Sequence, residues 1–274
     1  MTNADPPGIA SAERWLLPLL ARYFRLELRG AAARIPAWER EPCVFVMNHT
    51  ALLGLEVWLL FAALKALRPD APRPRATVWP PFLEVPGLGP FYRAAGCMPM
   101  TVEGAAATLR AGESVLILPE GPDATDVRDE IGPFHAGFLR VVKALLDEGR
   151  QVPVVPLGWA GVDEANPWWV TTHPLLVRML MKPAMPRFDF ALLPRPPLLR
   201  PSKVVFVAGS PERFAARDLA DEAKLRAQLG RMRDRVIELV VQAKWIREAR
   251  IEASRGEQLL HAIGRCRRVA WERR

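Results

Sequence analysis

Short apolar runs alternate with longer helical stretches over much of the chain. Runs rich in β-branched and other apolar residues, typical of buried strands, lie at residues 44–47, 76–79, 96–100, 114–118, 152–157 and 204–208. Between several of them lie stretches that we interpret as helices, at residues 55–67, 103–111 and 136–147. This order of strand and helix predicts an α/β fold with a largely parallel central sheet flanked by helices.

Residues 10–23 are predicted to form a short amphipathic helix. They contain the apolar run Trp15–Leu20, which Arg14 and Arg22 border. A tryptophan-containing apolar helix with bordering arginines fits an anchor in a membrane interface. The same pattern fits a helix packed against the rest of the domain, and both interpretations stay open. An edge strand is predicted next, at residues 24–28.

The last third of the chain is less regular. Residues 183–201 are rich in proline, which argues against a regular helix or a central strand. They fit either a rim loop over an apolar cavity or a surface linker. Residues 219–251 carry apolar residues at three-and-four spacing, as a long docked helix does, and a basic amphipathic tail follows. We therefore divide the chain into an N-terminal amphipathic segment (1–23), an α/β domain (24–218) and a C-terminal helix with its tail (219–274).

One predicted strand ends abruptly in two polar residues. Val44–Met47 runs into Asn48 and His49, and the apolar helix that follows carries Glu56 in its first turn. Polar residues at the end of a strand lie where α/β folds place their chemistry. A histidine there accepts a proton near neutral pH if a carboxylate holds its other ring nitrogen. A histidine that only caps a strand-to-helix turn is the alternative.

The composition is that of a globular protein, with 50% hydrophobic and 25% charged residues among 274. Cys43, Cys97 and Cys266 are widely spaced and form no C-x-x-C pair, so we expect neither a zinc site nor a disulfide framework. Residues 1–8 lack the pattern of a secretory signal, and the longest apolar stretch falls short of the ~20 residues of a membrane span. These features predict a cytoplasmic chain.

The net charge of +8 fits an acidic partner such as anionic lipid or nucleic acid, or serves only solubility. No helix-turn-helix, zinc or aromatic-basic sheet signature accompanies it, so we expect no nucleic acid partner. A peripheral location on the cytoplasmic face of a membrane fits both the charge and the N-terminal helix. The sequence leaves the oligomeric state open.

Three motifs occur in a fixed order: Asn48-His49 after a strand, Leu118–Gly121 after a strand, and Val152–Pro156 as a strand, with Gly87–Gly89 and Ala95–Met100 between the first two. This ordered set resembles the glycerolipid and lysophospholipid acyltransferase superfamily over about residues 24–210. The resemblance implies a membrane-associated O-acyltransferase of lipid metabolism, as in phospholipid biosynthesis. It implies an acyl thioester, acyl-CoA or acyl-carrier protein, as co-substrate, with no further cofactor and no metal.

The resemblance also assigns roles to residues. It implies that His49 is the general base and that Pro119, Glu120 and Gly121 help to form the acceptor and acyl-phosphopantetheine site. We add Asn48 and Arg93 to the expected substrate-binding residues. In this mechanism His49 takes the proton of the acceptor hydroxyl, and backbone amides near Glu120 and Gly121 stabilise the oxyanion. No G-x-S-x-G or similar nucleophile motif is present, which favours direct transfer over an acyl-enzyme.

The chain departs from the family pattern at the partner of the histidine. The family carries an aspartate five positions after the histidine, where this chain has Gly54. Glu56 is the expected substitute, acting with His49 as a catalytic residue. In one continuous helix the seven-residue separation, about 10 Å, would be too long for a hydrogen bond. The pairing therefore requires a turn at residues 50–53 and a helix that begins near Gly54.

Two arginines of the family pattern are also missing, since this chain has Val102 and Asp123 in their places. Those arginines commonly pair with the phosphate of the acceptor. Their absence favours a neutral acceptor, such as diacylglycerol or a long-chain alcohol, unless Arg93, Arg110 or Arg128 supplies the charge. The alternative to an enzyme is a catalytically degenerate, lipid-binding member of the same fold, because of the missing aspartate.

Overall fold

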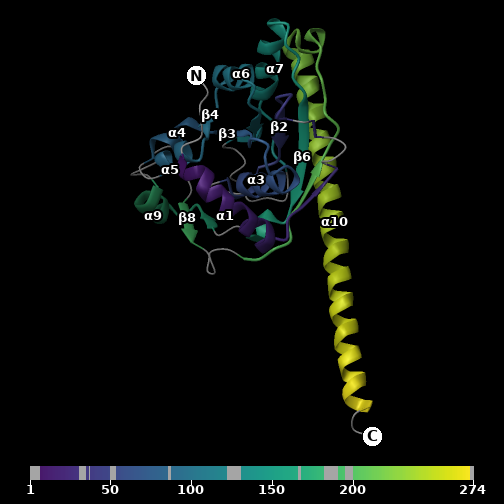
Figure 1. Cartoon of the computed structure of the whole chain (residues 1–274). Helices are drawn as coiled ribbons and strands as arrows, with labels where there is room; N and C mark the ends of the chain where they lie inside the picture. The colour runs from purple at the N-terminus through teal and green to yellow at the C-terminus, as the bar shows by residue number, and fades with distance from the viewer. Residues whose placement is uncertain are drawn as a thin grey trace.

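A seven-stranded sheet forms the centre of the molecule, with helices on both of its faces (Figure 1). In spatial order its strands are β1 (Glu27–Arg29), β9 (Val205–Ala208), β6 (Val154–Ala160), β2 (Val44–Met47), β5 (Val115–Ile117), β3 (Arg75–Val78) and β4 (Met98–Pro99). Neighbouring strands pair in parallel except β6 and β9, which are antiparallel. The expected α/β class, the largely parallel sheet and the edge position of the first strand are confirmed.

The structure is a computed structural model that describes residues 7–30, 35–36, 38–49, 54–85, 88–121, 131–165, 168–181, 191–194 and 200–271. Its helices are α1 (Pro7–Tyr23), α3 (Leu55–Leu67), α4 (Pro80–Glu84), α5 (Leu88–Ala94), α6 (Val102–Arg110), α7 (Gly137–Asp147), α8 (Val162–Ala165), α9 (Pro174–Leu176), the π-helical η3 (Val177–Met181), the 3-10 helix η4 (Ala216–Leu219) and α10 (Glu222–Trp271). No described helix combines the length and the apolar character that crossing a bilayer requires.

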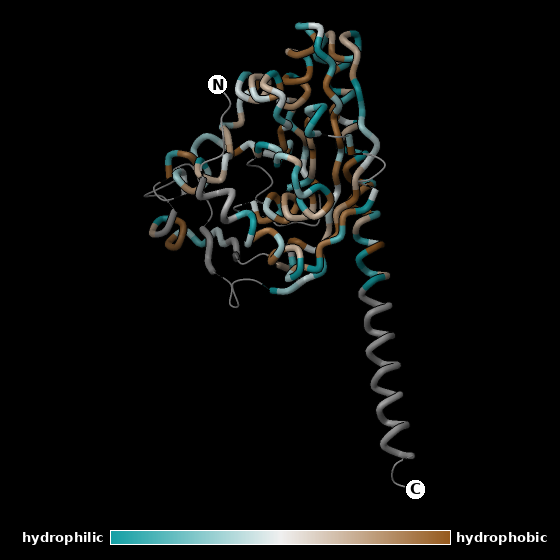
Figure 2. Tube along the Cα trace, in the orientation of Figure 1, coloured by the Kyte–Doolittle hydropathy of each residue, from teal (hydrophilic) through white to brown (hydrophobic). Residues whose placement is uncertain are grey.

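Alternation of side chains along the central strands divides the core into two layers. Phe45 and Met47 of β2 pack on the face that carries α1 and α3, whereas Val44 and Val46 pack on the face that carries α6, α7 and α10. Figure 2 shows the hydrophobic residues gathered in the body of the molecule around the sheet. Because β2 is buried on both faces, as expected for a central parallel strand, polar side chains first become possible where it ends.

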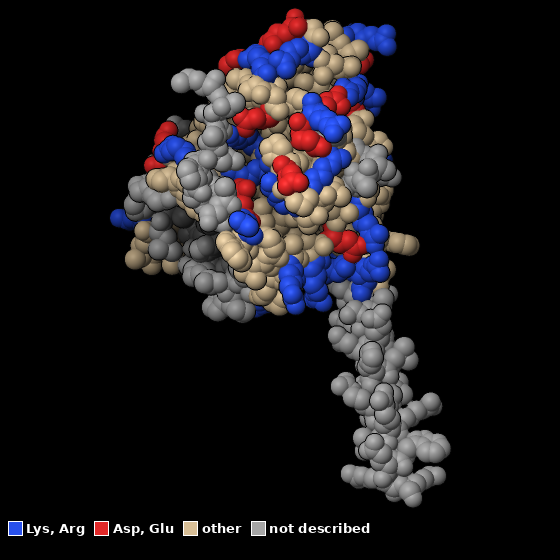
Figure 3. All heavy atoms as spheres, in the orientation of Figure 1, with Lys and Arg blue, Asp and Glu red and all other residues tan. Residues whose placement is uncertain are grey.

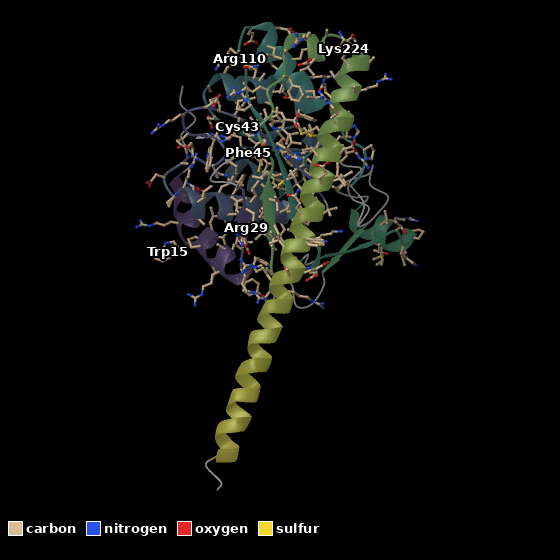
Figure 4. All side chains as sticks on the ribbon, turned by 90° about the vertical axis from the view of Figure 1, so that its right-hand side faces the viewer. Trp15, Arg29, Cys43, Phe45, Arg110 and Lys224 are labelled. Atoms are coloured by element: carbon tan, nitrogen blue, oxygen red, sulfur yellow. The ribbon has the colours of Figure 1, made fainter. Side chains whose placement is uncertain are left out.

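The last helix is longer than expected from the sequence. α10 has 50 residues, which corresponds to about 75 Å of helix, and it continues through the basic tail instead of ending near residue 251. Its first half packs along β6 and β9, and its second half extends beyond the body of the molecule (Figures 1 and 4). The crossing with β6 is close, since a Cβ on Gly158 would lie 2.7 Å from the Cβ of Leu239.

The proline-rich stretch takes part in a second, smaller sheet. Within residues 183–201, Ala191–Pro194 forms strand β8, which pairs antiparallel with β7 (Trp168–Thr171). This two-stranded sheet is separate from the central one, in agreement with the expectation that the stretch holds no central strand. The choice between a rim loop and a surface linker concerns mainly residues 183–190 and 195–199, which lie outside the described residues.

Candidate active site

Three neighbouring strands bring their polar ends together in the middle of the sheet. His49 follows the carboxyl end of β2, and Glu120 follows the parallel strand β5 on one side. On the other side, β6 contributes Trp159, whose backbone amide donates to Asn48 Oδ1 at 3.2 Å and whose ring nitrogen donates to the carbonyl of Asn48 at 2.8 Å. Asn48 is buried, so these bonds hold the end of β2 and fix the direction in which the chain leaves it.

His49 contacts Glu56 directly. The Nδ1 atom of the imidazole hydrogen-bonds Glu56 Oε1, and no hydrogen bond from Nε2 to a described residue is found. The pairing exists because α3 begins at Leu55, after Gly54 in the left-handed conformation with φ of 69°. Glu56 therefore lies in the first turn of the helix, as the sequence required, while the expected turn at residues 50–53 lies outside the described residues.

Burial and charge set the protonation of the pair. The side chain of Glu56 is fully buried, that of His49 is 20% exposed, and Glu56 Oε2 has no hydrogen-bond partner among the described residues. Burial alone would lower the pKa of His49, but the negative charge and hydrogen bond of Glu56, with the charge of Glu120, outweigh it and raise that pKa. The imidazole is thus arranged to accept and hold a proton at the site.

The carboxylate of Glu120 is turned into the protein. It accepts a hydrogen bond from the backbone amide of His49 at 2.7 Å and another from that of Gly132 at 2.7 Å. Burial raises the pKa of Glu120, against the effect of these two bonds. Both oxygens are therefore engaged in holding the backbone around His49, which fits a positioning role for Glu120.

Arg233 extends this network to α10. Its guanidinium donates to the carbonyl of Gly132 at 2.9 Å and to that of Ile131 at 2.7 Å. A continuous path of hydrogen bonds therefore joins Arg233 through Gly132 and Glu120 to His49. Sequence reasoning did not identify Arg233, because it is 101 residues from Gly132 and lies in no recognisable motif.

A pocket of about 140 Å³ adjoins the turn at Glu120. Pro119, Gly121, Val102 and the ring of His135 line it, together with apolar residues of α6 and α7. None of its described lining residues is Lys, Arg, Asp or Glu. His135 is exposed, and its backbone amide donates to the carbonyl of Pro119 at 2.7 Å, so the fold brings it to the turn at Glu120.

The arginines that could replace the missing phosphate-binding arginines of the family pattern lie as follows. Arg93 donates to the carbonyl of Leu83 at 2.7 Å. Arg110 pairs with Glu103 and Glu148, and it ends a helix that leads to the amino end of β5, whereas His49 follows the carboxyl end of the parallel strand β2. Arg110 therefore lies at the end of the strands opposite to the site. Arg128 and Asp123 lie outside the described residues.

One expected oxyanion donor is already in use. The backbone amide of Gly121 donates to the carbonyl of Leu118 at 3.1 Å, because the chain turns sharply after β5. This amide serves the turn here, and stabilisation of an oxyanion by backbone amides near Glu120 and Gly121 stays a prediction. No cluster of His, Cys, Asp and Glu that could hold a metal ion is found among the described residues.

Comparison with known proteins agrees with the motifs. Residues 28–160, which include His49, Glu56 and Glu120, match the family model described as Acyltransferase. No curated protein matches the chain. Among solved structures, the 1-acyl-sn-glycerophosphate acyltransferase PlsC from Thermotoga maritima is similar, with 16% sequence identity, coverage of 85% of this chain and 83% of that one, and a TM-score of 0.49. The match over residues 28–160 confirms, for that part of the chain, the resemblance to the acyltransferase superfamily that the motifs indicate.

Proposed function

We propose that the protein transfers a fatty acyl group from an acyl thioester, acyl-CoA or acyl-carrier protein, to a lipid hydroxyl, with His49 as general base. The observation that carries the proposal is the hydrogen bond between His49 and the buried carboxylate of Glu56 at the carboxyl end of β2. A histidine oriented in this way by a carboxylate is the arrangement used to remove a proton from a hydroxyl.

In the proposed reaction the Nδ1–H group of His49 donates to Glu56, which leaves Nε2 to act as the base. The acceptor oxygen attacks the thioester carbonyl carbon while Nε2 takes the hydroxyl proton. The carbon–sulfur bond then breaks, and the departing thiolate receives that proton, so the products are an ester and a free thiol. Glu56 stabilises the imidazolium between the two proton transfers.

Direct transfer is preferred to an acyl-cysteine intermediate. Burial raises the pKa of the Cys43 thiol to about 12 and that of the Cys97 thiol to about 11. The thiolate is the nucleophilic form of cysteine, and at neutral pH these two thiols are almost entirely protonated. The side chain of Cys266 lies outside the described residues.

The acceptor is proposed to be a neutral lipid hydroxyl, such as that of diacylglycerol or a long-chain alcohol. The pocket beside Pro119 has no charged Lys, Arg, Asp or Glu among its described lining residues, and Val102 stands on its wall. Arg110 is one possible substitute for the missing phosphate-binding arginines. It already pairs with two glutamates at the end of the strands opposite to the site. A phosphomonoester would therefore lose water at this pocket without gaining a Lys or Arg partner among the described lining residues.

The second candidate, a degenerate lipid-binding protein, is less well supported. Such a protein has no need for an ionisable carboxyl group that is fully buried against a histidine, because burying a charge without function destabilises the fold. Glu56 does lie within hydrogen-bonding reach of His49, which is the feature that a working base requires.

The proposal is tested by mass spectrometry of lipid extracts from cells that produce the wild-type protein, the His49→Ala variant or the His173→Ala variant. His173 is an exposed histidine that precedes α9 and serves as the matched control. We expect new acylated neutral lipids with the wild type and with His173→Ala, and none with His49→Ala. The same lipids in all three samples would contradict the proposed function.

A further inference from the structure

A groove lies between α1 and α3, apart from the site of His49. Its volume is about 810 Å³, within the range of small-ligand sites, and Arg14, Arg22 and Lys65 are among its lining residues. Lys65 follows Glu56 by nine positions in α3, which is about 14 Å along the helix axis. The groove and the catalytic pair are therefore different places on the same helix.

The residues of α1 are arranged in two adjacent rows beside this groove. Arg14, Pro18 and Arg22, four positions apart, line the groove. Trp15, Leu19 and Tyr23 form the next row, and 76%, 63% and 40% of their respective surfaces are exposed. Figure 4 shows Trp15 on the outer side of α1, and Figure 3 shows basic side chains beside uncharged surface on the face that carries this helix. A basic row and an exposed apolar row thus run side by side.

The charge of the groove is predominantly positive. Its carboxylates are Glu13 and Asp70. Glu13 forms an ion pair with Arg73, a buried residue outside the groove lining, and that pair ties α1 to the body of the protein. No ion pair of Arg14, Arg22 or Lys65 with a described carboxylate is found. The ammonium of Lys65 donates to the carbonyl of Ala71 at 2.8 Å, which fixes its place at the end of α3. Three cations therefore face one carboxylate that has no ion pair among the described residues.

The floor of the groove is apolar. Leu17 and Ala62 are buried in it, and the rest of the uncharged lining consists of Pro18, Ala21, Ala66 and Pro69. A ligand that satisfies both parts carries a negative charge at one end and hydrocarbon at the other. Free phosphate matches only the cations, and a zwitterionic lipid brings its own cation to a site that is already positive.

We propose that this groove binds one anionic phospholipid, with the phosphate between Arg14, Arg22 and Lys65 and the upper part of an acyl chain on the apolar floor. The neighbouring row of Trp15, Leu19 and Tyr23 would then lie at the membrane interface, where aromatic and aliphatic side chains beside cations are favourable. Lipid binding in this groove does not depend on the chemistry at His49.

The test uses dihexanoyl phosphatidylglycerol below its micelle concentration, titrated into the full chain and followed by isothermal calorimetry. Dihexanoyl phosphatidylcholine and inorganic phosphate are titrated in parallel. Because a charge-assisted hydrogen bond contributes about a factor of ten or more in affinity, we expect the anionic lipid to bind about tenfold more tightly than either comparison ligand. Inorganic phosphate that binds as tightly as the lipid would overturn the proposal.

Two double variants distinguish a specific binding site from nonspecific charge attraction. Arg14→Gln with Arg22→Gln removes two groove cations, and Arg217→Gln with Arg226→Gln removes two exposed arginines of η4 and α10 that likewise form no ion pair with a described carboxylate. We expect the groove double variant to bind dihexanoyl phosphatidylglycerol at least tenfold more weakly and the control to stay within twofold of wild type. Equal losses in both double variants, or no loss in the first, would contradict a specific site.

A third variant fills the groove without changing its charge. Ala66 is exposed within the groove lining, so Ala66→Phe occupies the space that the acyl chain would take. We expect this variant to bind the lipid about tenfold more weakly while its thermal unfolding matches that of wild type. Undiminished binding by a folded Ala66→Phe variant would show that the lipid does not enter the groove.

Discussion

His49 and Glu56 are seven positions apart in the sequence, yet the Nδ1 atom of one hydrogen-bonds the carboxylate of the other. In a continuous helix the two side chains would be separated by about two turns. The left-handed Gly54 instead lets α3 begin at Leu55, so that Glu56 lies in its first turn. This chain has a glycine at the position where the resembling family carries an aspartate, and we propose that Glu56 takes the place of that aspartate.

Replacement of Glu56 should change the pH dependence of acyl transfer. Glu56 is the main reason that the pKa of His49 is raised, because burial alone would lower it. The base must be neutral, so the rate of the wild type should fall as the pH drops through a value above the ordinary ~6.5 of histidine. In Glu56→Gln we expect this fall to move to lower pH, and the maximal rate to decrease about a hundredfold or more, since Nδ1 loses its anionic partner.

Measurement of kcat/KM from pH 5 to 9 checks this prediction, with Glu148→Gln as the control. Glu148 is an exposed residue that follows α7, and its carboxylate pairs with Arg110. An acidic fall at the same pH in wild type and Glu56→Gln would mean that His49 is not the group that titrates, or that Glu56 does not control it.

Arg233 is expected to stabilise the loop that holds Glu120. Arg233→Ala removes the donors of two part-buried hydrogen bonds to the carbonyls of Ile131 and Gly132, which should lower the free energy of unfolding by about 1–3 kcal/mol. Arg235→Ala, two residues further along α10, removes a surface pair with Glu238 and a weaker attraction to Glu212, and should cost less than about 1 kcal/mol. Urea denaturation measures both values, and equal losses would argue against a special role for Arg233.

The crossing of α10 and β6 makes a second prediction about stability. A Cβ on Gly158 would lie 2.7 Å from the Cβ of Leu239, against the backbone of α10, so Gly158→Ala should destabilise the fold by about 1–3 kcal/mol. A Cβ added at Gly230, in the same helix, would meet no atom of another part of the described structure within 4 Å. Gly230→Ala should therefore stabilise the protein by about 0.5–1 kcal/mol through helix propensity. Thermal unfolding of the two variants checks the opposite signs, and a stabilising Gly158→Ala would mean that α10 lies further from the sheet.

Local sequence was sufficient to predict the strand that ends in Asn48 and His49 and the helix at residues 55–67. The apolar runs there are short-range signals, and a glycine before the helix permits the turn. The pairing of His49 with Glu56 followed from the same seven residues. By contrast, three hydrogen bonds join segments that are distant in the chain: the one from Gly132 to Glu120 and the two from Arg233. No sequence pattern predicts them.

The length of α10 was underestimated for a different reason. Its first half has an apolar face that packs on the sheet, and its docked spacing is visible in the sequence. Beyond residue 251 the sequence is rich in charge, so the pattern of a buried face weakens although the backbone remains helical.

The acceptor preference tests whether the absence of the two family arginines indicates a neutral acceptor. With one acyl thioester as donor, we expect kcat/KM for diacylglycerol or a long-chain alcohol to exceed that for lysophosphatidate or glycerol phosphate at least tenfold. The reason is that the described lining of the pocket beside Pro119 offers a phosphate no cation. Initial rates with each acceptor at equal donor concentration decide the matter. Faster acylation of a phosphorylated acceptor would show that a cation such as Arg93 or Arg128 acts in the site.

The central claim is that His49 removes the proton of the acceptor hydroxyl. Its most direct test is the rate of ester formation by purified His49→Ala, measured with an acyl thioester and a neutral acceptor beside wild type and His173→Ala. We expect His49→Ala to lose activity by a factor of about 10²–10⁴ while its circular dichroism and thermal unfolding stay close to those of wild type. A rate within a few-fold of wild type would contradict the assignment of His49 as the base.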